Sequence, residues 1–358
     1  MKYERLGNIA TYINGYPFKP KDRGEKGLPI IRIQDLTGNA YDLGFYDGQY
    51  PKRIEINDGD VLISWSASLG VYIWKRGKAL LNQHIFKVVF DKADINKLYF
   101  VYAVQYKLKE MKGKTHGATM KHIVKKDFEN TLIPFPSVDE QCRIASLLSK
   151  VAEIISDRRN QIEKLDELVK ARFVEMFGDP VSNPKKWPTK RFSEICKNLD
   201  SRRKPITASE RKAGIYPYYG ASGIVDYVEE YIFDENILLV SEDGANLLMR
   251  STPIAFSVSG KVWVNNHAHV VKFEKMSLQK YIEIYFSLID ISDHITGSAQ
   301  PKLNQAKLNT MVFGIPDNVL LERYYAFVTQ VDKSKVVVQK ALDEVQLLFD
   351  SLMQKYFG

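Results

Sequence analysis

The feature that most constrains this chain is a long helical pattern that occurs twice. Apolar residues recur at alternating steps of four and three across residues 144–176, and the same pattern returns at 324–356, 180 positions later. This spacing is the seam of a coiled coil, in which one stripe of a helix packs against a partner helix. Eight of the ten seam positions are apolar in the first stretch and nine in the second. We therefore expect two long, equivalent helices.

The seam residues should be buried between the two helices. They are Ile144, Leu148, Val151, Ile155, Ile162, Leu165 and Val169 in the first helix, and Val328, Val331, Val338, Leu342, Val345 and Phe349 in the second. Arg158, Arg172 and Lys335 interrupt the seam. A charged residue at such a position either fixes the register of the helices or lays its stem on the seam while its head reaches water.

The similarity between the two halves extends beyond the seam. The helical stretches end in Phe177-Gly178 and Phe357-Gly358, and glycine commonly ends a helix because it adopts the left-handed conformation without a steric clash. Before each helix lies a strand-like run that proline interrupts, "NTLIPFP" at 130–136 and "NTMVFGIP" at 309–316. The repeat therefore includes the approach to each helix as well as the helix.

The segments upstream of the helices are predicted to form two equivalent α/β domains. "NQHIFKVVF" at 82–90 matches "NNHAHVVKF" at 265–273, in each case a polar pair and a histidine entering a β-rich run. The predicted fold is α+β, an internal pseudo-two-fold repeat in which the two long helices pack as an antiparallel coiled coil. Its segments are a first domain at 1–135, a helix at 136–180, a second domain at 181–315 and a helix at 316–358.

The charge of the chain favours a polyanionic partner. The net charge is +8, with an isoelectric point near 9.1. Basic residues gather at 106–126 in the first half and at "SRRK" 201–204 in the second, although either run alone could be solvated surface. No apolar run is long enough to cross a bilayer, the N-terminus has no signal-peptide pattern, and the two cysteines suit a reducing compartment. We expect a cytoplasmic protein.

Motifs that would carry catalysis are missing. The sequence has no phosphate-binding loop, no dinucleotide-binding glycine motif, and no Pro-Pro pair of the kind that adenine methyltransferases use. Glu110 and Lys112 have the spacing of a nuclease pair, but no suitable Pro-Asp precedes them. His267 and His269 alternate as metal ligands on a strand would, yet His267 matches His84 in the other half, so we interpret them as structural. Neither a catalytic residue nor a metal site is predicted.

Three phrases resemble a known family. "PSVDEQCRIASLLSKV" at 136–151, "ARFVEMFGDP" at 171–180 and "YPYYGASGIVDYV" at 216–228 are similar to phrases of the specificity subunits of type I restriction–modification systems. The resemblance covers essentially the whole chain. The second helix departs from the pattern, because it has Leu321-Glu322 where the first has Gln141-Cys142.

The resemblance implies a DNA-reading subunit that is not itself an enzyme. Each target-recognition domain would read one half of a bipartite, asymmetric site in double-stranded DNA. The helices would set the spacing and dock two copies of an adenine-N6 methyltransferase subunit, which a restriction and translocase subunit joins for cleavage. S-adenosylmethionine, ATP and Mg²⁺ would belong to those partners, and this chain would hold no cofactor. The target adenine would be flipped into the partner's pocket.

Candidate DNA contacts follow from residue chemistry, because lysine and arginine bind phosphates while side chains at base edges provide specificity. The phosphate candidates are Lys112, Lys114, Lys121, Arg202, Arg203, Lys204 and Lys302. The base-reading candidates are Arg32, Gln34, Trp65, Ser66, Tyr218, Tyr219, Ser222, Glu242 and Asn246. We expect Arg32 and Gln34 to share a strand face, and the tyrosines could alternatively be core residues.

Two other functions compete with this interpretation. A protein-interaction scaffold with two heads would bind DNA weakly and without dependence on salt, whereas a DNA reader loses affinity steeply as salt rises. A stand-alone nucleic-acid enzyme would be active in purified form, against the missing motifs. The recognised bases and the spacer length do not follow from the sequence.

Overall fold

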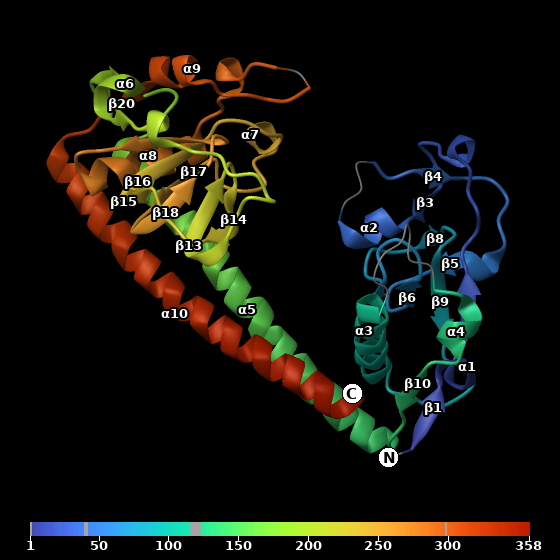
Figure 1. Ribbon diagram of the computed structural model, residues 1–358. Coiled ribbons are helices and arrows are strands. Elements are labelled where there is room, and N and C mark those ends of the chain that lie inside the picture. The colour runs from blue at the N-terminus through green and yellow to red at the C-terminus, as the bar shows by residue number, and fades with distance from the viewer. Residues whose placement is uncertain (1, 39–41, 115–122, 298) are drawn as a thin grey trace. The chain divides into compact units, whose positions relative to one another are not determined.

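The structure is a computed structural model that describes residues 2–38, 42–114, 123–297 and 299–358 (Figure 1). The chain divides into two compact units. Unit 1 consists of residues 1–158 and 341–358, and unit 2 of residues 159–340. Two long helices, α5 (Val138–Phe177) and α10 (Asn318–Phe357), contribute residues to both units, so neither unit is built from one half of the repeat alone.

Unit 1 has two four-stranded sheets and a two-stranded one in its described residues. The strand orders are β2-β9-β6-β7, β4-β3-β8-β5 and β1-β10, and only the β3–β8 pair is parallel. The strands are β1 (Tyr3–Arg5), β2 (Thr11–Asn14), β3 (Leu28–Ile31), β4 (Phe45–Tyr46), β5 (Glu55–Ile56), β6 (Val61–Ser64), β7 (Gly70–Ile73), β8 (Ala79–Leu81), β9 (Ile85–Val89) and β10 (Leu132–Pro134). Besides α5 and α10, the helices are α1 (Leu6–Ile9), α2 (Ile33–Thr37), α3 (Lys97–Lys114) and α4 (Lys125–Glu129), with 3₁₀ turns at Pro20–Asp22 and Lys52–Ile54.

Unit 2 repeats this topology with every strand number raised by ten. Its sheets have the orders β12-β19-β16-β17, β14-β13-β18-β15 and β11-β20, with β13–β18 as the parallel pair. The strands are β11 (Thr189–Arg191), β12 (Lys197–Asn198), β13 (Ala213–Gly220), β14 (Gly223–Val228), β15 (Phe233–Asp234), β16 (Ile237–Ser241), β17 (Ala255–Val258), β18 (Lys261–Val264), β19 (Ala268–Lys272) and β20 (Val312–Gly314). The helices are α6 (Phe192–Ile195), α7 (Asn246–Met249), α8 (Met276–Leu288) and α9 (Gln305–Thr310), with 3₁₀ turns at Asp200–Arg202 and Ser292–His294. The predicted repeat of two α/β domains is confirmed.

Both long helices have 40 residues, close to the predicted length, and local capping explains their bounds. The Ser137 hydroxyl and the Asp317 carboxylate accept hydrogen bonds from backbone N–H groups in the first turns of α5 and α10. Gly178 ends α5 with a φ of 82° and donates its N–H to the carbonyl of Val174. Neither helix, nor any other in the described part of the chain, is long and apolar enough to cross a membrane.

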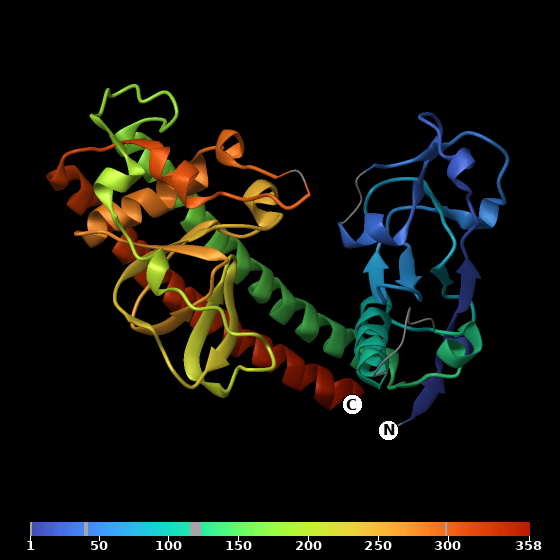
Figure 2. The ribbon, with the colours of Figure 1, turned by 45° about the horizontal axis from the view of Figure 1, so that its top comes forward.

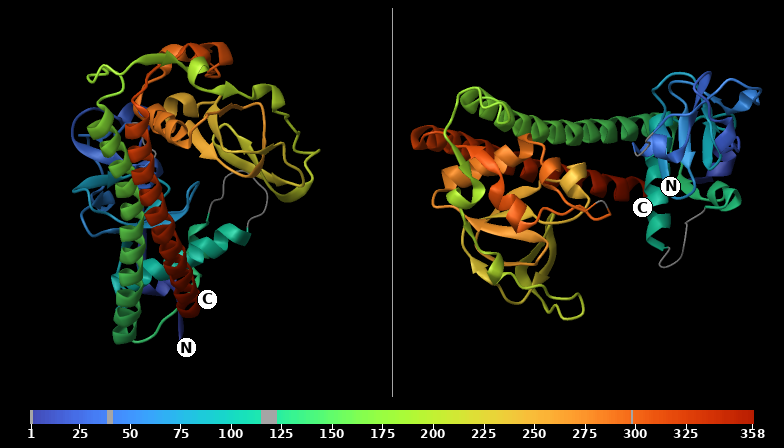
Figure 3. Two further views of the ribbon diagram at one scale, coloured as in Figure 1. Left: turned by 90° about the vertical axis from the view of Figure 1, so that its left-hand side faces the viewer. Right: turned by 90° about the horizontal axis from the view of Figure 1, so that it is seen from above.

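The seam lies between α5 and α10, which run antiparallel inside each unit (Figure 3). All thirteen predicted seam residues are buried or half-buried. The interruptions behave in two ways. The Arg172 guanidinium lies 5.7 Å from the centre of the Phe327 ring and pairs with Glu175, whereas Lys335 of α10 forms an ion pair with Asp166 of α5. Lys335 therefore links the two helices within unit 2.

Each unit closes its core with the end of a long helix. In unit 2 the ring of Phe177 lies 4.8 Å from that of Tyr281 on α8. Helix α8 lies beside the sheet that contains β16 and β17 (Figure 2). In unit 1 the fully buried Phe357 lies 5.2 Å from Tyr99 of α3. The two tyrosines are equivalent, because Tyr99 donates its hydroxyl proton to the carbonyl of Pro134 and Tyr281 to that of Gly314. The end of α10 thus completes the core of unit 1, and the end of α5 completes the core of unit 2.

The role of Phe357 gives a prediction about local stability. Phe357→Ala should lower the stability of unit 1 by about 3–5 kcal/mol, the usual effect of removing a buried aromatic ring. Unit 2 should be unchanged. Hydrogen exchange resolved by peptide would report this as faster exchange in β6 and β9 but not in β16 and β19. The matched variant Phe177→Ala should give the opposite pattern, and equal loss in both units would contradict the assignment of each ring to one core.

Candidate nucleic-acid interface

In unit 2 the ends of several strands bring their loops to one edge of the sheets. Ser241 at the end of β16 pairs with Ala268 at the start of β19, and the Ser241 hydroxyl donates to the carbonyl of Ala221 in the β13–β14 turn. Leu303 donates its N–H to the carbonyl of Glu242 at 2.8 Å. We call this set the unit 2 loop edge. It comprises residues 199–204, 220–223, 241–246, 265–269 and 301–304.

Unit 1 has an equivalent edge with the same backbone pairing. Ser64 at the end of β6 pairs with Ile85 at the start of β9, and Asn82 donates its N–H to the carbonyl of Ile31 at the end of β3. Ile123 donates its N–H to the carbonyl of Trp65 at 3.0 Å, as Leu303 does to Glu242. The unit 1 loop edge comprises residues 14–16, 31–35, 64–68, 81–85 and 123.

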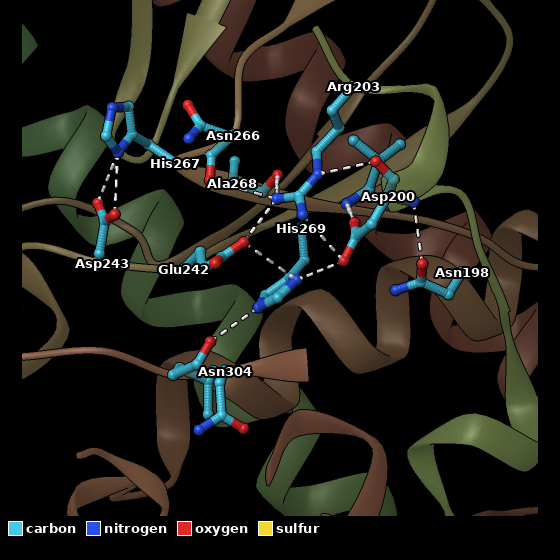
Figure 4. A network of polar contacts seen from close by, with 12 residues as sticks. Asn198, Asp200, Arg203, Glu242, Asp243, Asn266, His267, Ala268, His269 and Asn304 are labelled. Atoms are coloured by element: carbon cyan, nitrogen blue, oxygen red, sulfur yellow. Dashed lines mark hydrogen bonds and ion pairs between the residues drawn. The ribbon is translucent and has the colours of Figure 1, made fainter. Parts of the chain in front are cut away.

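A buried ionic cluster lies beneath the unit 2 loop edge (Figure 4). His269, which is 1% exposed, has its Nδ1 atom 2.6 Å from an Asp200 carboxylate oxygen and its Nε2 atom 2.8 Å from the carbonyl oxygen of Leu303. Asp200 also accepts the N–H of Val270 at 2.7 Å. The cluster therefore joins the 3₁₀ turn after β12 to β19 and to the segment that precedes α9.

Two cations complete the cluster around Glu242. Arg203 places a guanidinium nitrogen 2.6 Å from one Glu242 oxygen, and Lys302 places its ammonium 3.1 Å from the other. Asp200, Glu242 and His269 are close enough together to share a metal ion. However, Arg203 and Lys302 already supply positive charge to these carboxylates, so the arrangement is that of an ion-pair network.

The network also decides the protonation of its carboxylates. Burial acts to raise the pKa of Asp200, but the hydrogen bond and charge of His269 and the N–H of Val270 outweigh it and leave that pKa lowered. Burial likewise acts to raise the pKa of Glu242. The hydrogen bond from Arg203 and the charge of His269 outweigh burial, so the pKa of Glu242 is lowered. Both groups are therefore carboxylates at neutral pH.

The phosphate candidates of unit 1 lie at the end of α3 and beyond it. Lys112 is exposed on that helix. Lys114 is its last residue, and its side chain is not among the described parts of the structure. Lys121 lies outside the described residues altogether.

In unit 2, Arg202 and Arg203 are neighbours in sequence but reach opposite ends of β16. Arg202 pairs with Glu235, which precedes that strand, whereas Arg203 pairs with Glu242, which follows it. Only the Arg203 side chain thus faces the loop edge, where it is largely buried. Lys204 is exposed.

The expectation that Arg32 and Gln34 share a strand face is wrong. Strand β3 ends one residue earlier, and Arg32 is the N-cap residue of α2, where its backbone N–H and its Nε donate to the Asp35 carboxylate. The "IRIQDL" stretch leaves the sheet here because Asp35 caps the new helix. Gln34 is in the first turn of α2 and is exposed.

The other two base-reading candidates of unit 1, Trp65 and Ser66, directly follow β6. Trp65 is half-buried, stacks on Phe86 with 5.6 Å between ring centres, and has its Nε1 atom 3.4 Å from the Asn14 side-chain oxygen. Ser66 is buried. Trp65 is thus the more accessible of the pair.

The candidates on the β13–β14 hairpin differ in exposure. Tyr218 is buried, its hydroxyl bonded to the backbone of Ile206, so it matches the core alternative. Tyr219 is half-buried, and burial raises its pKa. Ser222 is exposed in the turn.

Asn246 and Glu242 are already engaged within the fold. Asn246 donates to the carbonyl of Thr252 and accepts from the Thr252 N–H and the Ser251 hydroxyl, which closes the loop after α7. Glu242 belongs to the ionic cluster described above. Both residues therefore stabilise the conformation of the loop edge through contacts within the fold.

Sequence reasoning missed two members of this edge. Asp200 lies far from His269 in the chain, so a search for acidic residues near the histidine could not find it. His267 was interpreted as structural, yet its side chain is half exposed, with Nδ1 held by both carboxylate oxygens of Asp243 at 2.9 and 3.0 Å. The available signal was the "SED" phrase at 241–243, which places Glu242 and Asp243 directly after the last residue of β16, where they can pair with the histidines.

The lowered pKa values of Asp200 and Glu242 predict acid sensitivity in unit 2. Carboxyls with a lowered folded-state pKa stabilise a protein above their ordinary range, near pH 4, and this stabilisation is lost as pH falls through the folded-state pKa. Between pH 6 and pH 3, unit 2 should therefore lose more stability than unit 1, where Asn14, Trp65 and Phe86 occupy the equivalent positions and do not titrate. Urea unfolding at each pH, read by exchange labelling at one fixed pH, measures both units at once. Equal losses would contradict the prediction.

Comparisons with known proteins agree with this geometry. The family described as "Type I restriction modification DNA specificity domain" matches residues 1–164 and 184–345. The EcoBI specificity subunit of Escherichia coli is 28% identical over 46% of this chain and 35% of its own length, and the MjaIX specificity subunit of Methanocaldococcus jannaschii is 21% identical over 94% and 91%. The first curated relatives are matched over about a third of their length.

A solved structure has the same fold. The S subunit of a type I restriction–modification system from M. genitalium superposes with a TM-score of 0.56 at 15% identity, covering 100% of this chain and 96% of that one. The two domain matches of the family together span most of the sequence. The chain therefore belongs to the family of type I restriction–modification DNA specificity proteins.

Proposed function

We propose that this chain is the DNA sequence-specificity subunit of a type I restriction–modification complex and has no catalytic activity of its own. Residues 1–135 and 181–315 act as target-recognition domains, and the helices of 136–180 and 316–358 act as spacers. Each recognition domain reads one half of a bipartite, asymmetric site in double-stranded DNA. The observation that carries the proposal is the pair of loop edges, which share one backbone pattern but present different side chains.

The difference between the loop edges is what reading two unlike half-sites requires. Equivalent backbones place their loops in equivalent positions, while the side chains decide which base edges or phosphates they bind. At the equivalent positions after β6 and β16, unit 1 has Trp65 and unit 2 has Glu242. A protein that bound one symmetric site would need the same side chains twice.

The described side chains favour some of the candidate contacts over others. For phosphates we favour the exposed Lys112 and Lys204 and the half-exposed Lys302. For bases we favour Gln34, Trp65 and Ser222. The candidates engaged inside the fold support the loops that carry these contacts. They are Arg32, Ser66, Arg203, Tyr218, Glu242 and Asn246.

The partners follow from the exposed faces of the long helices. Leu168 on α5 and Leu348 on α10 occupy equivalent positions of the repeat, and they are 46% and 51% exposed. Contiguous apolar surface often marks an interaction site, and we take each of these leucines as the centre of such a surface. Because the two positions are equivalent, we propose that they dock two copies of one methyltransferase subunit, which brings S-adenosylmethionine. A restriction subunit that uses ATP and Mg²⁺ completes the complex in the cytoplasm.

This arrangement predicts the stoichiometry of docking variants. Leu168→Asp or Leu348→Asp should each remove one methyltransferase copy from the complex, because a carboxylate in an apolar interface loses its hydration without gaining a partner. Native mass spectrometry should find two copies on the unmodified chain, one on each variant and none on the double variant. Lys170→Asp, on the opposite side of α5 from Leu168, is the control and should retain two. Two copies on all variants would exclude these docking faces.

The main test is the methylation pattern of a host that carries this chain with its methyltransferase subunit. Methylome sequencing should show a bipartite motif with N6-methyladenine on both strands. Replacing residues 1–134 by the first domain of another family member should change one half of the motif and leave the other half intact. If the complex forms and binds S-adenosylmethionine but methylates no motif, the chain is a protein-interaction scaffold and does not read DNA.

A further inference from the structure

The two units have different kinds of side chains at the equivalent position beneath their loop edges. Asn14, Trp65 and Phe86 of unit 1 occupy the backbone positions of Asp200, Glu242 and His269 in unit 2, as the strand registers and the shared bonds from Ile123 and Leu303 establish. In unit 1 the position holds the stack of Trp65 on Phe86 and a long polar contact from Trp65 to Asn14. In unit 2 it holds charges. The fold therefore does not require charges at this position.

Both ring nitrogens of His269 face oxygen atoms. The carbonyl oxygen of Leu303 can only accept, so the Nε2 atom 2.8 Å away donates to it. The Nδ1 atom lies 2.6 Å from one oxygen of Asp200, whose other oxygen accepts the Val270 N–H. The ring thus bridges Asp200 and the Leu303 carbonyl.

These contacts hold the segment 301–304 in place. The Leu303 carbonyl accepts from the His269 ring, and the Leu303 N–H donates to the carbonyl of Glu242. Gly244, two residues after Glu242, donates its N–H to the carbonyl of Pro301. Lys302 lies between those two anchor points, with its ammonium paired to Glu242 and its side chain 50% exposed. The ammonium is therefore held at the surface of the loop edge.

We propose that His269 is a positioning residue for DNA binding by unit 2, because its ring bridges Asp200 and the Leu303 carbonyl, fixes segment 301–304 and so places the Lys302 ammonium against a DNA phosphate. This inference rests on the proposed function. It assigns His269 an indirect role, since the buried ring itself does not reach DNA. The aromatic stack of unit 1 does not supply the same ionic anchor.

The test is the salt dependence of DNA binding by the complex of this chain with its methyltransferase subunit, on a duplex that carries the recognised site. The slope of log K against log salt is negative, and Lys302→Ala should reduce its magnitude by about 0.9, which weakens binding roughly eightfold at about 0.1 M salt. Both amide donors of glutamine are on one nitrogen, so glutamine cannot bridge Asp200 and the Leu303 carbonyl as the two ring nitrogens do. His269→Gln should therefore reduce the slope almost as much as Lys302→Ala, and the double variant should equal Lys302→Ala alone.

The control separates positioning from a general loss of stability. Tyr281→Phe removes a buried hydrogen bond to Gly314 in unit 2, away from the loop edge, and should leave the slope unchanged. A second measurement does not depend on any His269 variant folding. In ¹⁵N-histidine spectra of the unmodified complex, the Nε2 atom of His269 should carry a proton, because it donates to the Leu303 carbonyl.

The outcomes distinguish this inference from the proposed function. An unchanged slope for His269→Gln, additive losses in the double variant, or a His269 ring without a proton on Nε2 would each overturn the positioning role while DNA binding by the unmodified complex persists. If the unmodified complex itself binds DNA without preference for the site and without dependence on salt, the proposed function fails instead.

Discussion

Burial of the apolar stripe shared by α5 and α10 is the interaction on which the rest of the structure depends. A helix of 40 residues with one apolar face is not stable alone in water, and each helix here gains its stability by covering the other. The aromatic residues at the helix ends then enter the cores of the sheet-containing parts. The packing of the sheets consequently depends on the packing of the two helices.

The helices and the repeat could be predicted because periodicity is local information. Seam spacing, the Phe177-Gly178 ending and the proline-interrupted strands each act over a few residues, and all were recognisable at a constant offset. The equivalence of β3 and β13 was harder to see, because those segments share backbone pairing and little sequence. Their register is decided by contacts with β8 and β18, which no local pattern reports.

The candidate site was less predictable for a related reason. Residue types suggested which side chains could bind DNA, but not which were already engaged. Arg203 looked like a phosphate ligand until the fold brought Glu242 and Asp200 to it. Such pairs depend on distant segments meeting, and removal of one partner from a buried pair commonly costs about 3–5 kcal/mol. A buried charge therefore stays with its partner in the fold and is not available to a ligand.

The division of the units has a consequence for synthesis. Unit 2 is one continuous stretch, residues 159–340, whereas unit 1 needs residues 341–358 to cover Tyr99. During synthesis, all residues of unit 2 therefore emerge before those of unit 1 are complete. Until residues 341–358 emerge, part of the core of unit 1 stays open to solvent. Domains usually fold in the order in which they emerge. Here the N-terminal sheets are completed last, and a nascent chain that stalls before α10 ends would expose an unfinished aromatic core to chaperones and proteases.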